Sequence, residues 1–287
     1  MEIPKLNLKE FLMENKGYKV LKRCVDTTII QLSTGEILKI LDDELLKIIS
    51  DTGYNLETRL KETPKLKQFD KFALPSRMFE DEDIVKGYTM SYIPGVDFTD
   101  YYENIFDLMG YANIHSQIED NIKDGNNLGI VFPDLCTTEN IRVTADGKVF
   151  FIDYDGLQIK EMPAVGFSDF LGTPEEVLVN KYFDCKSNLF TKELDIKSAI
   201  FLYFVDVFGI NLGTVNRINP VNGRKISLDY IFSIINLEDM DIQHKVWKLF
   251  QPTIPNEFLG DDIYKLAEKY KLVMPCSDIK IKKLIKR

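Results

Sequence analysis

The hydrophobic pattern of this 287-residue chain changes once along its length, and this change constrains the fold more than any other feature. Short runs typical of β-strands prevail before residues 92–95, whereas beyond them apolar residues mostly recur every three or four positions, as in helices. The Pro and Gly of the YIPG segment (92–95) interrupt the strand pattern. Strands first and helices later are typical of an α+β protein. We therefore predict an α+β fold in two parts, residues 1–94 rich in strands and residues 95–287 mainly helical.

The first part of the chain is expected to form an antiparallel sheet with two helices. Its first three β-prone runs are short and separated by turn-forming residues, which predicts a three-stranded meander. Asn55 suits a helix N-cap and Pro64 suits a helix stop, so a helix is expected between them. A second helix is expected over residues 42–50. The predicted strands are residues 18–23, 28–32, 36–41, 73–79 and 84–92, the last two separated by an acidic turn.

The second part of the chain begins with a predicted helix, and a hairpin comes after it. Over residues 101–117, apolar side chains recur every three or four positions, which predicts an amphipathic helix. Two β-prone runs, residues 141–143 and 148–152, flank Asp146 and Gly147, a pair whose positive φ angles suit a tight turn. The remaining helices are expected from residue 195 onward and near residues 261–271.

The hairpin also predicts where polar side chains meet. Because a tight turn folds the two strands back on each other, Asn140 and Asp153 at their outer ends should lie side by side. An amide oxygen and a carboxylate are hard ligands suited to Mg²⁺, which keeps coordination positions for phosphate oxygens and water. Asp134 lies on the loop leading into the hairpin, where its carboxylate could orient a hydroxyl nucleophile or accept its proton.

Charge, hydropathy and cysteine spacing exclude several classes of protein. The net charge of -9, of which residues 95–287 carry -8, argues against a general nucleic-acid binder, because such a protein needs a positive surface. The N-terminal segment lacks the apolar stretch of a secretory signal, and the most apolar run, residues 199–210, is too short to span a bilayer. The four cysteines lack metal-binding spacing. We therefore expect a cytoplasmic protein with no membrane span and no nucleic-acid partner.

Two motifs around the hairpin resemble those of the protein kinase family. The loop FPDLCTTEN (132–140) and the hairpin end IDYDG (152–156) are similar in order to the family's HRDxxxxN and DFG motifs. Weaker similarities occur in the family's order at EILKIL (36–41), YTMSYIPG (88–95), IHSQ (114–117), GTPEE (172–176) and LDIKSAIFLYF (194–204). The resemblance covers roughly residues 18–270 and implies a two-lobed protein kinase-like fold, with a nucleotide cleft between residues 1–94 and residues 95–287.

The resemblance implies an ATP- and Mg²⁺-dependent phosphotransferase, similar to a protein Ser/Thr kinase, that transfers the γ-phosphate to a hydroxyl of a protein or small molecule. It implies that Lys39 contacts the α- and β-phosphates of ATP. Without the resemblance, the apolar run around Lys39 is also compatible with a lysine at a sheet edge whose ammonium reaches the solvent. Glu57, placed on the helical face of Leu60, would be the ion-pair partner of Lys39, with Glu62 as the fallback.

The same resemblance implies the remaining site residues. Met90 and Tyr92, at the end of the strand that leads to the hinge, would contact the nucleotide. Asp134 would be the catalytic carboxylate, and Asn140 and Asp153 would bind Mg²⁺.

The chain departs from the kinase pattern at several positions. The turn at residues 23–28 lacks the glycine-rich motif that lets the backbone approach phosphates closely. Phe132 and Pro133 replace the family's His-Arg, and the interval from Asp134 to the Asn is one residue longer than in the family. Cys136 stands where a basic residue is expected. Asp155 replaces the Gly of DFG, where it could add a metal ligand or cap the turn after it.

Other functions remain open from the sequence. Because the acidic and metal-binding groups are retained, active chemistry is favoured over a pseudokinase that acts as a nucleotide-binding or interaction scaffold. A small-molecule kinase of the same fold is a second alternative, and a pure interaction module using the acidic second part and the basic residues 279–287 is a third. A cysteine hydrolase would pair Cys136 with His115 or His244, but no activating motif surrounds this cysteine.

Overall fold

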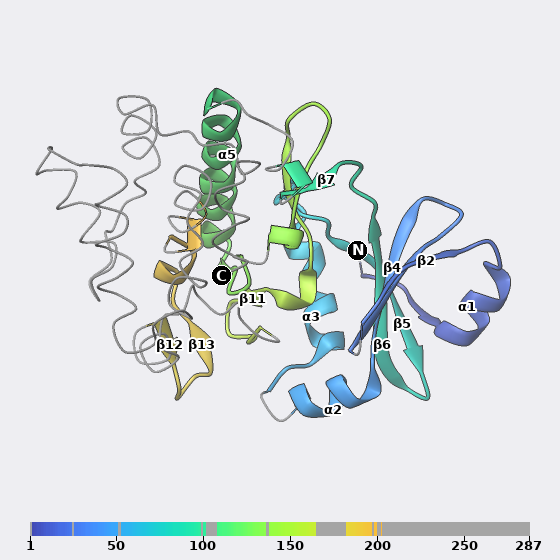
Figure 1. Cartoon of the computed structure of the whole chain (residues 1–287). Helices are drawn as coiled ribbons and strands as arrows, with labels where there is room; N and C mark the ends of the chain where they lie inside the picture. The colour runs from blue at the N-terminus through green and yellow to red at the C-terminus, as the bar shows by residue number, and fades with distance from the viewer. Residues whose placement is uncertain are drawn as a thin grey trace, which may run out of the picture.

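The computed structural model describes residues 2–24, 26–50, 53–98, 100–101, 108–135, 138–164, 182–196, 198–199 and 202. Within them the fold is mixed α and β, with an antiparallel-rich sheet in the N-terminal part (Figure 1). Predictions made for residues 172–176, 261–271 and 279–287, and for Cys136 and His244, fall outside the described residues. In the described part of the chain, no helix is long and apolar enough to cross a membrane.

The N-terminal sheet has six strands in the order β1-β5-β6-β4-β3-β2. The predicted meander is confirmed, because β2, β3 and β4 pair antiparallel in sequence order. β6 joins β4 and β5 antiparallel, whereas β1 pairs with β5 in the parallel direction and was not predicted. The strands are β1 (Lys5–Asn7), β2 (Lys19–Arg23), β3 (Thr27–Gln31), β4 (Glu36–Leu41), β5 (Pro75–Asp81) and β6 (Ile84–Ser91).

The two faces of this sheet pack against different parts of the protein. Side chains alternate along a strand, so Leu38 of β4 points to one face, where helix α1 (Leu8–Glu14) covers it. Ile37 and Leu41 point to the opposite face and join the main core. Lys39 lies between these two residues and therefore points in the same direction, toward the second part of the chain.

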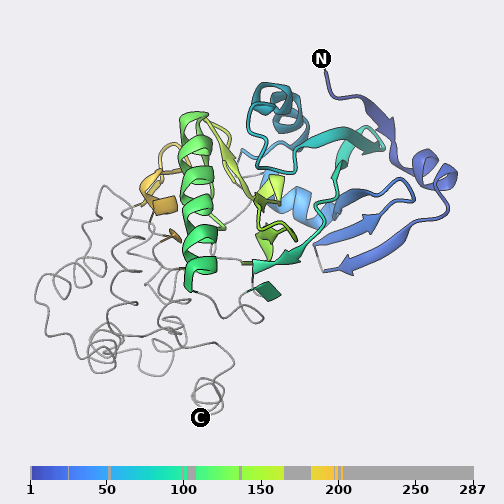
Figure 2. The same cartoon turned by 90° about the horizontal axis from the view of Figure 1, so that it is seen from above.

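Two helices come after β4, close to their predicted positions. Helix α2 spans Asp43–Ser50, and helix α3 spans Leu56–Glu62. Asn55 caps α3 as predicted, because its Oδ1 accepts the N–H of Thr58 at 2.8 Å. A short 3₁₀ turn, η1 (Thr63–Leu66), continues from α3. In Figures 1 and 2, α3 lies between the sheet and the elements of the second part.

The helix predicted over residues 101–117 continues further than expected. Helix α5 spans Leu108–Asn127, so its predicted end at Gln117 is wrong. The buried residues Ile114, Ile118 and Ile122 continue the apolar face in steps of four among many polar neighbours, which explains the longer helix. At the far end, Gly129 adopts a φ of 80°, a left-handed conformation that suits glycine after a helix.

The predicted hairpin is confirmed, with one correction at its turn. β9 (Ile141–Val143) pairs antiparallel with β10 (Val149–Phe151), and β7 (Val96–Asp97) pairs with the other edge of β9. Gly147 has a positive φ of 75°, whereas Asp146 does not, so the turn is a wider loop than the predicted two-residue turn. The other short elements are β8 (Ile130–Val131), η2 (Thr138–Asn140), η3 (Tyr154–Gly156), β11 (Gln158–Ile159), β12 (Phe183–Asp184) and β13 (Leu189–Phe190).

One hydrophobic core joins the sheet to the second part of the chain. Ile37 and Met90 from the sheet belong to the same cluster of buried side chains as Phe98, Phe151 and Tyr154. The predicted boundary at residues 92–95 lies between β6 and β7, and β7 already pairs with the hairpin. The segment therefore connects two layers that share a core.

Candidate functional site

The two ends of the hairpin meet as predicted. The N–H of Ile152 donates to the carbonyl oxygen of Asn140 at 2.9 Å, which holds the segments leading to Asn140 and Asp153 together. Both side chains line the same two pockets. This proximity could be predicted from the sequence of the hairpin alone, because a hairpin with a short loop must bring its outer ends together.

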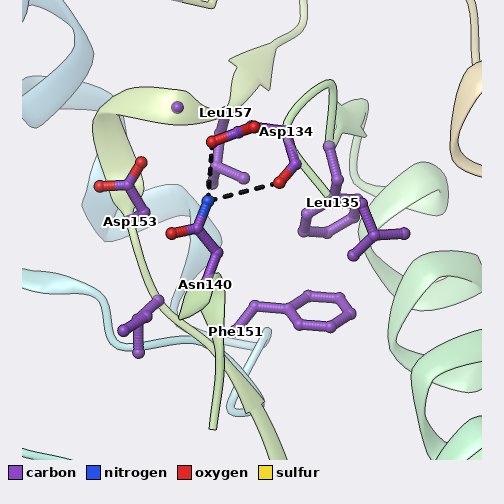
Figure 3. A pocket seen from close by; sticks show the side chains of 9 residues that line it. Asp134, Leu135, Asn140, Phe151, Asp153 and Leu157 are labelled. Atoms are coloured by element: carbon purple, nitrogen blue, oxygen red, sulfur yellow. Dashed lines mark hydrogen bonds between the residues drawn. The ribbon is translucent and has the colours of Figure 1, made fainter. Parts of the chain in front are cut away.

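Asp134 lies against Asn140 on the loop that precedes the hairpin. The Asn140 amide Nδ2 donates to Asp134 Oδ2 at 2.8 Å and to the Asp134 carbonyl at 3.3 Å (Figure 3). The amide oxygen of Asn140 consequently lies on the side of Asp153, as Figure 3 shows. The three residues line a small pocket of about 20 Å³, which has room for about one water molecule.

The backbone at Asp153 places its carboxylate in this pocket. Asp153 has φ 77° and ψ 66°, a left-handed conformation that is uncommon for a residue with a Cβ. Gly156 lies directly behind the carboxylate, because a Cβ built on Gly156 would be 2.7 Å from Asp153 Oδ2. The glycine therefore leaves the space that the carboxylate occupies.

Lys39 reaches this site from the centre of the sheet. Its side chain is 8% exposed, and Nζ forms an ion pair with Asp153 and a second with Asp155 Oδ1 at 2.8 Å. Asp155 Oδ1 also accepts a hydrogen bond of 2.6 Å from the hydroxyl of Tyr88, on the neighbouring strand β6. Two carboxylates and one ammonium thus form a buried cluster where the sheet meets the hairpin.

Burial and mutual attraction shift the pKa values of this cluster in different directions. Burial opposes the charge on Lys39, but Asp155 and Asp153 outweigh it, so the pKa of Lys39 is raised. Burial, reinforced by the charge of Asp155, raises the pKa of Asp153 to about 6. Asp155 is also buried, yet Lys39 and the Tyr88 hydroxyl hold its pKa below the ordinary value. Asp155 is therefore the more firmly ionised partner of Lys39.

A larger pocket opens beside the cluster, between the sheet and the hairpin. Its volume is about 350 Å³, within the range of pockets that bind small molecules. The structure brings most of the predicted site residues to its wall, with Met90 buried and Tyr92 exposed. The lining residues are Leu21, Lys22, Ile29, Ile37, Lys39, Met90, Ser91, Tyr92, Ile93, Asp97, Glu139, Asn140, Arg142, Ile152 and Asp153.

The predicted ion pair between Lys39 and Glu57 is contradicted by the structure. Glu57 pairs with Lys61 at 2.8 Å and with Lys5 at 3.7 Å, and lines neither of the two pockets. The fallback, Glu62, pairs with Lys65 at 2.6 Å. The error lies in the rotation of α3, since its buried residues are Leu56, Arg59 and Leu60, an arrangement that turns both glutamates away from Lys39.

Arg59 is a residue near the site that sequence reasoning missed, as it missed the Tyr88 hydroxyl. It is fully buried, and its guanidinium donates to the carbonyl oxygens of Pro163 at 2.7 Å, Tyr154 at 3.2 Å, and Leu157. Its position three residues after Leu56 and four before Thr63 was the available signal, because these spacings share one helical face. Arg59 thereby ties α3 to the segment that carries Asp153 and Asp155.

Comparison with known proteins adds no family assignment, since neither a protein-family model nor a curated protein sequence matches this chain. The function of the site therefore rests on its residues and geometry. Among the described residues, no group of three or more His, Cys, Asp and Glu side chains could hold a metal ion. His115, one partner in the cysteine hydrolase alternative, is buried with its ring 5.6 Å from that of Phe98.

Proposed function

We propose that this protein is an ATP- and Mg²⁺-dependent phosphotransferase with a two-lobed, protein kinase-like arrangement, which transfers the γ-phosphate to a hydroxyl group. One observation carries the proposal: Lys39, Asn140 and Asp153, from the sheet and from both ends of the hairpin, line one pocket of about 350 Å³. The order of these residues along the chain and the motifs around them, which resemble those of protein kinases, support the same activity.

The nucleotide would lie in the larger pocket with its phosphates toward the Lys39 cluster. Apolar side chains of Ile29, Ile37, Met90 and Ile152 would contact the flat base. The raised pKa of Lys39 keeps its ammonium charged at neutral pH, so that it can bind phosphate oxygens. Since the turn at residues 23–28 lacks glycines, its backbone would not approach the phosphates closely. The residues just before the turn that line the pocket are Leu21 and Lys22.

Asn140 and Asp153 fit the requirements of Mg²⁺ as a pair of oxygen ligands. The amide nitrogen of Asn140 is engaged by Asp134, so the amide oxygen is left for a metal on the side of Asp153 (Figure 3). Mg²⁺ typically takes few protein oxygens and completes its shell with phosphate oxygens and water. When bound, the ion supplies positive charge that offsets the charge on the transferred phosphoryl group.

Asp134 would act on the hydroxyl acceptor. Its carboxylate lies on the loop before the hairpin and is fixed by the hydrogen bond from Asn140. In this position it would orient the acceptor hydroxyl and accept its proton. The acceptor is a hydroxyl of a protein or of a small molecule, and screening both classes with the purified protein separates these two branches of the proposal.

The proposal predicts that Mg-ATP raises the melting temperature of the purified chain and that the chain transfers the γ-phosphate to itself or to an added acceptor. Asp153→Asn should abolish transfer, because the metal site loses its carboxylate, and Asp146→Asn in the exposed hairpin loop is a matched control. Radiolabelled γ-phosphate transfer and thermal shift measure the two effects. Binding without transfer would assign a nucleotide-dependent scaffold, and absence of both would refute the proposal.

A further inference from the structure

We propose that Asp155 is the positioning residue for Lys39. Its carboxylate, which belongs to the same segment as Asp153, takes the role expected of a glutamate on helix α3. The inference rests on the proposed function and deepens it, because it concerns how the phosphate-binding lysine is held. In the kinase-like interpretation, a glutamate of α3 is expected in this role, and the structure places both candidate glutamates of α3 away from Lys39.

The contacts of Asp155 are those of a partner for a buried lysine. Its side chain is 6% exposed, and Oδ1 accepts from Lys39 Nζ at 2.8 Å and from the Tyr88 hydroxyl at 2.6 Å. Tyr88 is the direct cross-strand neighbour of Lys39 in the β4–β6 pair. The hydroxyl and the ammonium thus reach the same carboxylate oxygen from adjacent strands, so the sheet fixes the carboxylate and the carboxylate fixes the lysine.

Asp153 and Asp155 face different surroundings although only Tyr154 separates them in the chain. Asp153 lines both pockets beside the hairpin, and its side chain is 22% exposed. Asp155 lines neither pocket, and it contacts at 2.8 Å the ammonium of Lys39, which does line the larger one. Of the two roles that the sequence left open for Asp155, a metal ligand would have to face the pocket, which Asp155 does not line. Its contact with Lys39 is a third role, which does not require it to face the pocket.

Helix α3 also contacts the segment that carries Asp155, but through Arg59 and not through a carboxylate. Arg59 donates to the carbonyl oxygens of Tyr154 and Leu157, which lie on either side of Asp155. The Cζ atom of the Arg59 guanidinium also lies 4.9 Å from the centre of the Tyr54 ring, and this cation–π contact further stabilises the side chain in the core. The lysine, the metal-binding carboxylate and the helix are thus all fixed to residues 153–157, and α3 contributes no charge to Lys39.

The test measures the affinity of the full chain for ADP by calorimetry, once with Mg²⁺ and once with EDTA. Asp155→Asn should weaken binding about tenfold or more, and Tyr88→Phe by a smaller factor, because each weakens charged hydrogen bonding at Lys39. Both factors should be the same with and without Mg²⁺. Asp153→Asn should weaken binding mainly when Mg²⁺ is present. Glu57→Gln, a carboxylate removed from α3, should leave the affinity within about twofold.

Two results would overturn the inference. An effect of Asp155→Asn that is confined to Mg²⁺ would make Asp155 a metal ligand. An effect of Glu57→Gln as large as that of Asp155→Asn would return the lysine partner to the helix. If Asp155→Asn does not fold, Tyr88→Phe carries the test, because it leaves the carboxylate in place and removes only its second hydrogen bond.

A second measurement separates failure of this inference from failure of the proposed function. If the chain binds no nucleotide, the proposed function fails, and melting temperatures of Lys39→Met, Asp155→Asn and the double variant still test the pairing. Asp155→Asn should lower the melting temperature less in the Lys39→Met background than in the wild type, because the lysine is no longer left without its partner. Equal losses in both backgrounds would overturn the pairing.

Discussion

At the residue scale, the site depends on the absence of a side chain at one residue, Gly156. A methyl group at this position would meet Asp153 Oδ2 at 2.7 Å, and the end of a side chain can move away more easily than backbone can. The residue therefore controls the position of the carboxylate more than the stability of the fold.

In the proposed function, Gly156→Ala should raise the Mg²⁺ concentration needed for half-maximal phosphoryl transfer, because the displaced carboxylate of Asp153 would no longer lie beside the amide oxygen of Asn140. The melting temperature should change by only about 2 °C, in line with a local shift of one side chain. A magnesium titration of activity together with a thermal melt measures both effects. A large loss of stability with an unchanged magnesium requirement would contradict this account of Gly156.

The same scale shows what could be predicted from individual residues. Asn140 and Asp153 could be placed together from sequence because a hairpin imposes their proximity locally. The pairing of Lys39 with Asp155 could not be predicted in this way, because it depends on how the sheet docks on the hairpin. Likewise, the positions of Glu57 and Arg59 depend on the rotation of α3, which tertiary packing fixes.

At the scale of elements, Arg59 fastens helix α3 to the segment after β10. Its guanidinium satisfies three carbonyl oxygens at the heart of the core, from Tyr154, Leu157 and Pro163. A buried carbonyl oxygen without a hydrogen-bond donor lowers the stability of the folded state, so the contacts of Arg59 should stabilise both α3 and the segment after β10.

Arg59→Leu should lower the free energy of unfolding by about 2–4 kcal/mol, because the carbonyl oxygens lose their donors while the helix keeps its apolar face. Lys61→Ala on the exposed side of the same helix should change it by less than about 0.5 kcal/mol, as expected for a surface ion pair. Urea unfolding measures both values. Equal effects of the two substitutions would show that Arg59 does not fasten the helix.

Asp195 fastens a second element, the helical stretch that begins at residue 193, to the loop before Asp134. Its Oδ1 accepts the N–H of Phe132 at 2.8 Å, and its Oδ2 accepts from Asn126 Nδ2 at 3.2 Å. Burial raises the pKa of Asp195 well above its ordinary value, although both hydrogen bonds oppose this shift.

A raised pKa in the folded state means that the folded protein holds the Asp195 proton to higher pH than the unfolded chain does. The contribution of Asp195 to stability should therefore fall as the pH rises from the ordinary pKa of 3.8 through the raised value. Urea unfolding of the wild type and of Asp195→Asn over this range tests the sign. The wild type should lose stability relative to the variant with rising pH, and a relative gain would contradict the assignment.

Sequence periodicity predicts some of the helices and strands and misses others. The meander, α2, α3 and the hairpin arise from local patterns and were predicted close to their observed bounds. The parallel pairing of β1 with β5 was not predicted, because it joins segments far apart in sequence. The extension of α5 to Asn127 was missed because its apolar face narrows to single isoleucines between polar residues.

At the scale of the whole molecule, the shared core makes the two parts depend on each other. The sheet face that carries Ile37, Leu41 and Met90 is buried by residues of the second part, among them Phe98 and Tyr154. An isolated sheet of residues 1–94 would expose this face to water, and the lost burial would leave too little apolar surface to offset its conformational entropy.

A fragment of residues 1–94 is therefore expected to lack a cooperative thermal transition by circular dichroism, whereas the full chain should unfold with one. The fragment ends within the segment that connects β6 to β7, so it keeps every strand of the six-stranded sheet. A fragment that melts cooperatively near the temperature of the full chain would show that the first part is an independent domain.

In the proposed function, Lys39, Asn140 and Asp153 converge on the phosphates and metal of one nucleotide. The most direct measurement is a crystal structure of the full chain with a non-hydrolysable ATP analogue and Mg²⁺. We expect the base in the pocket of about 350 Å³, Lys39 on the phosphates, and oxygens of Asn140 and Asp153 on the metal. A nucleotide bound elsewhere, or a pocket that stays empty at saturating nucleotide, would contradict it.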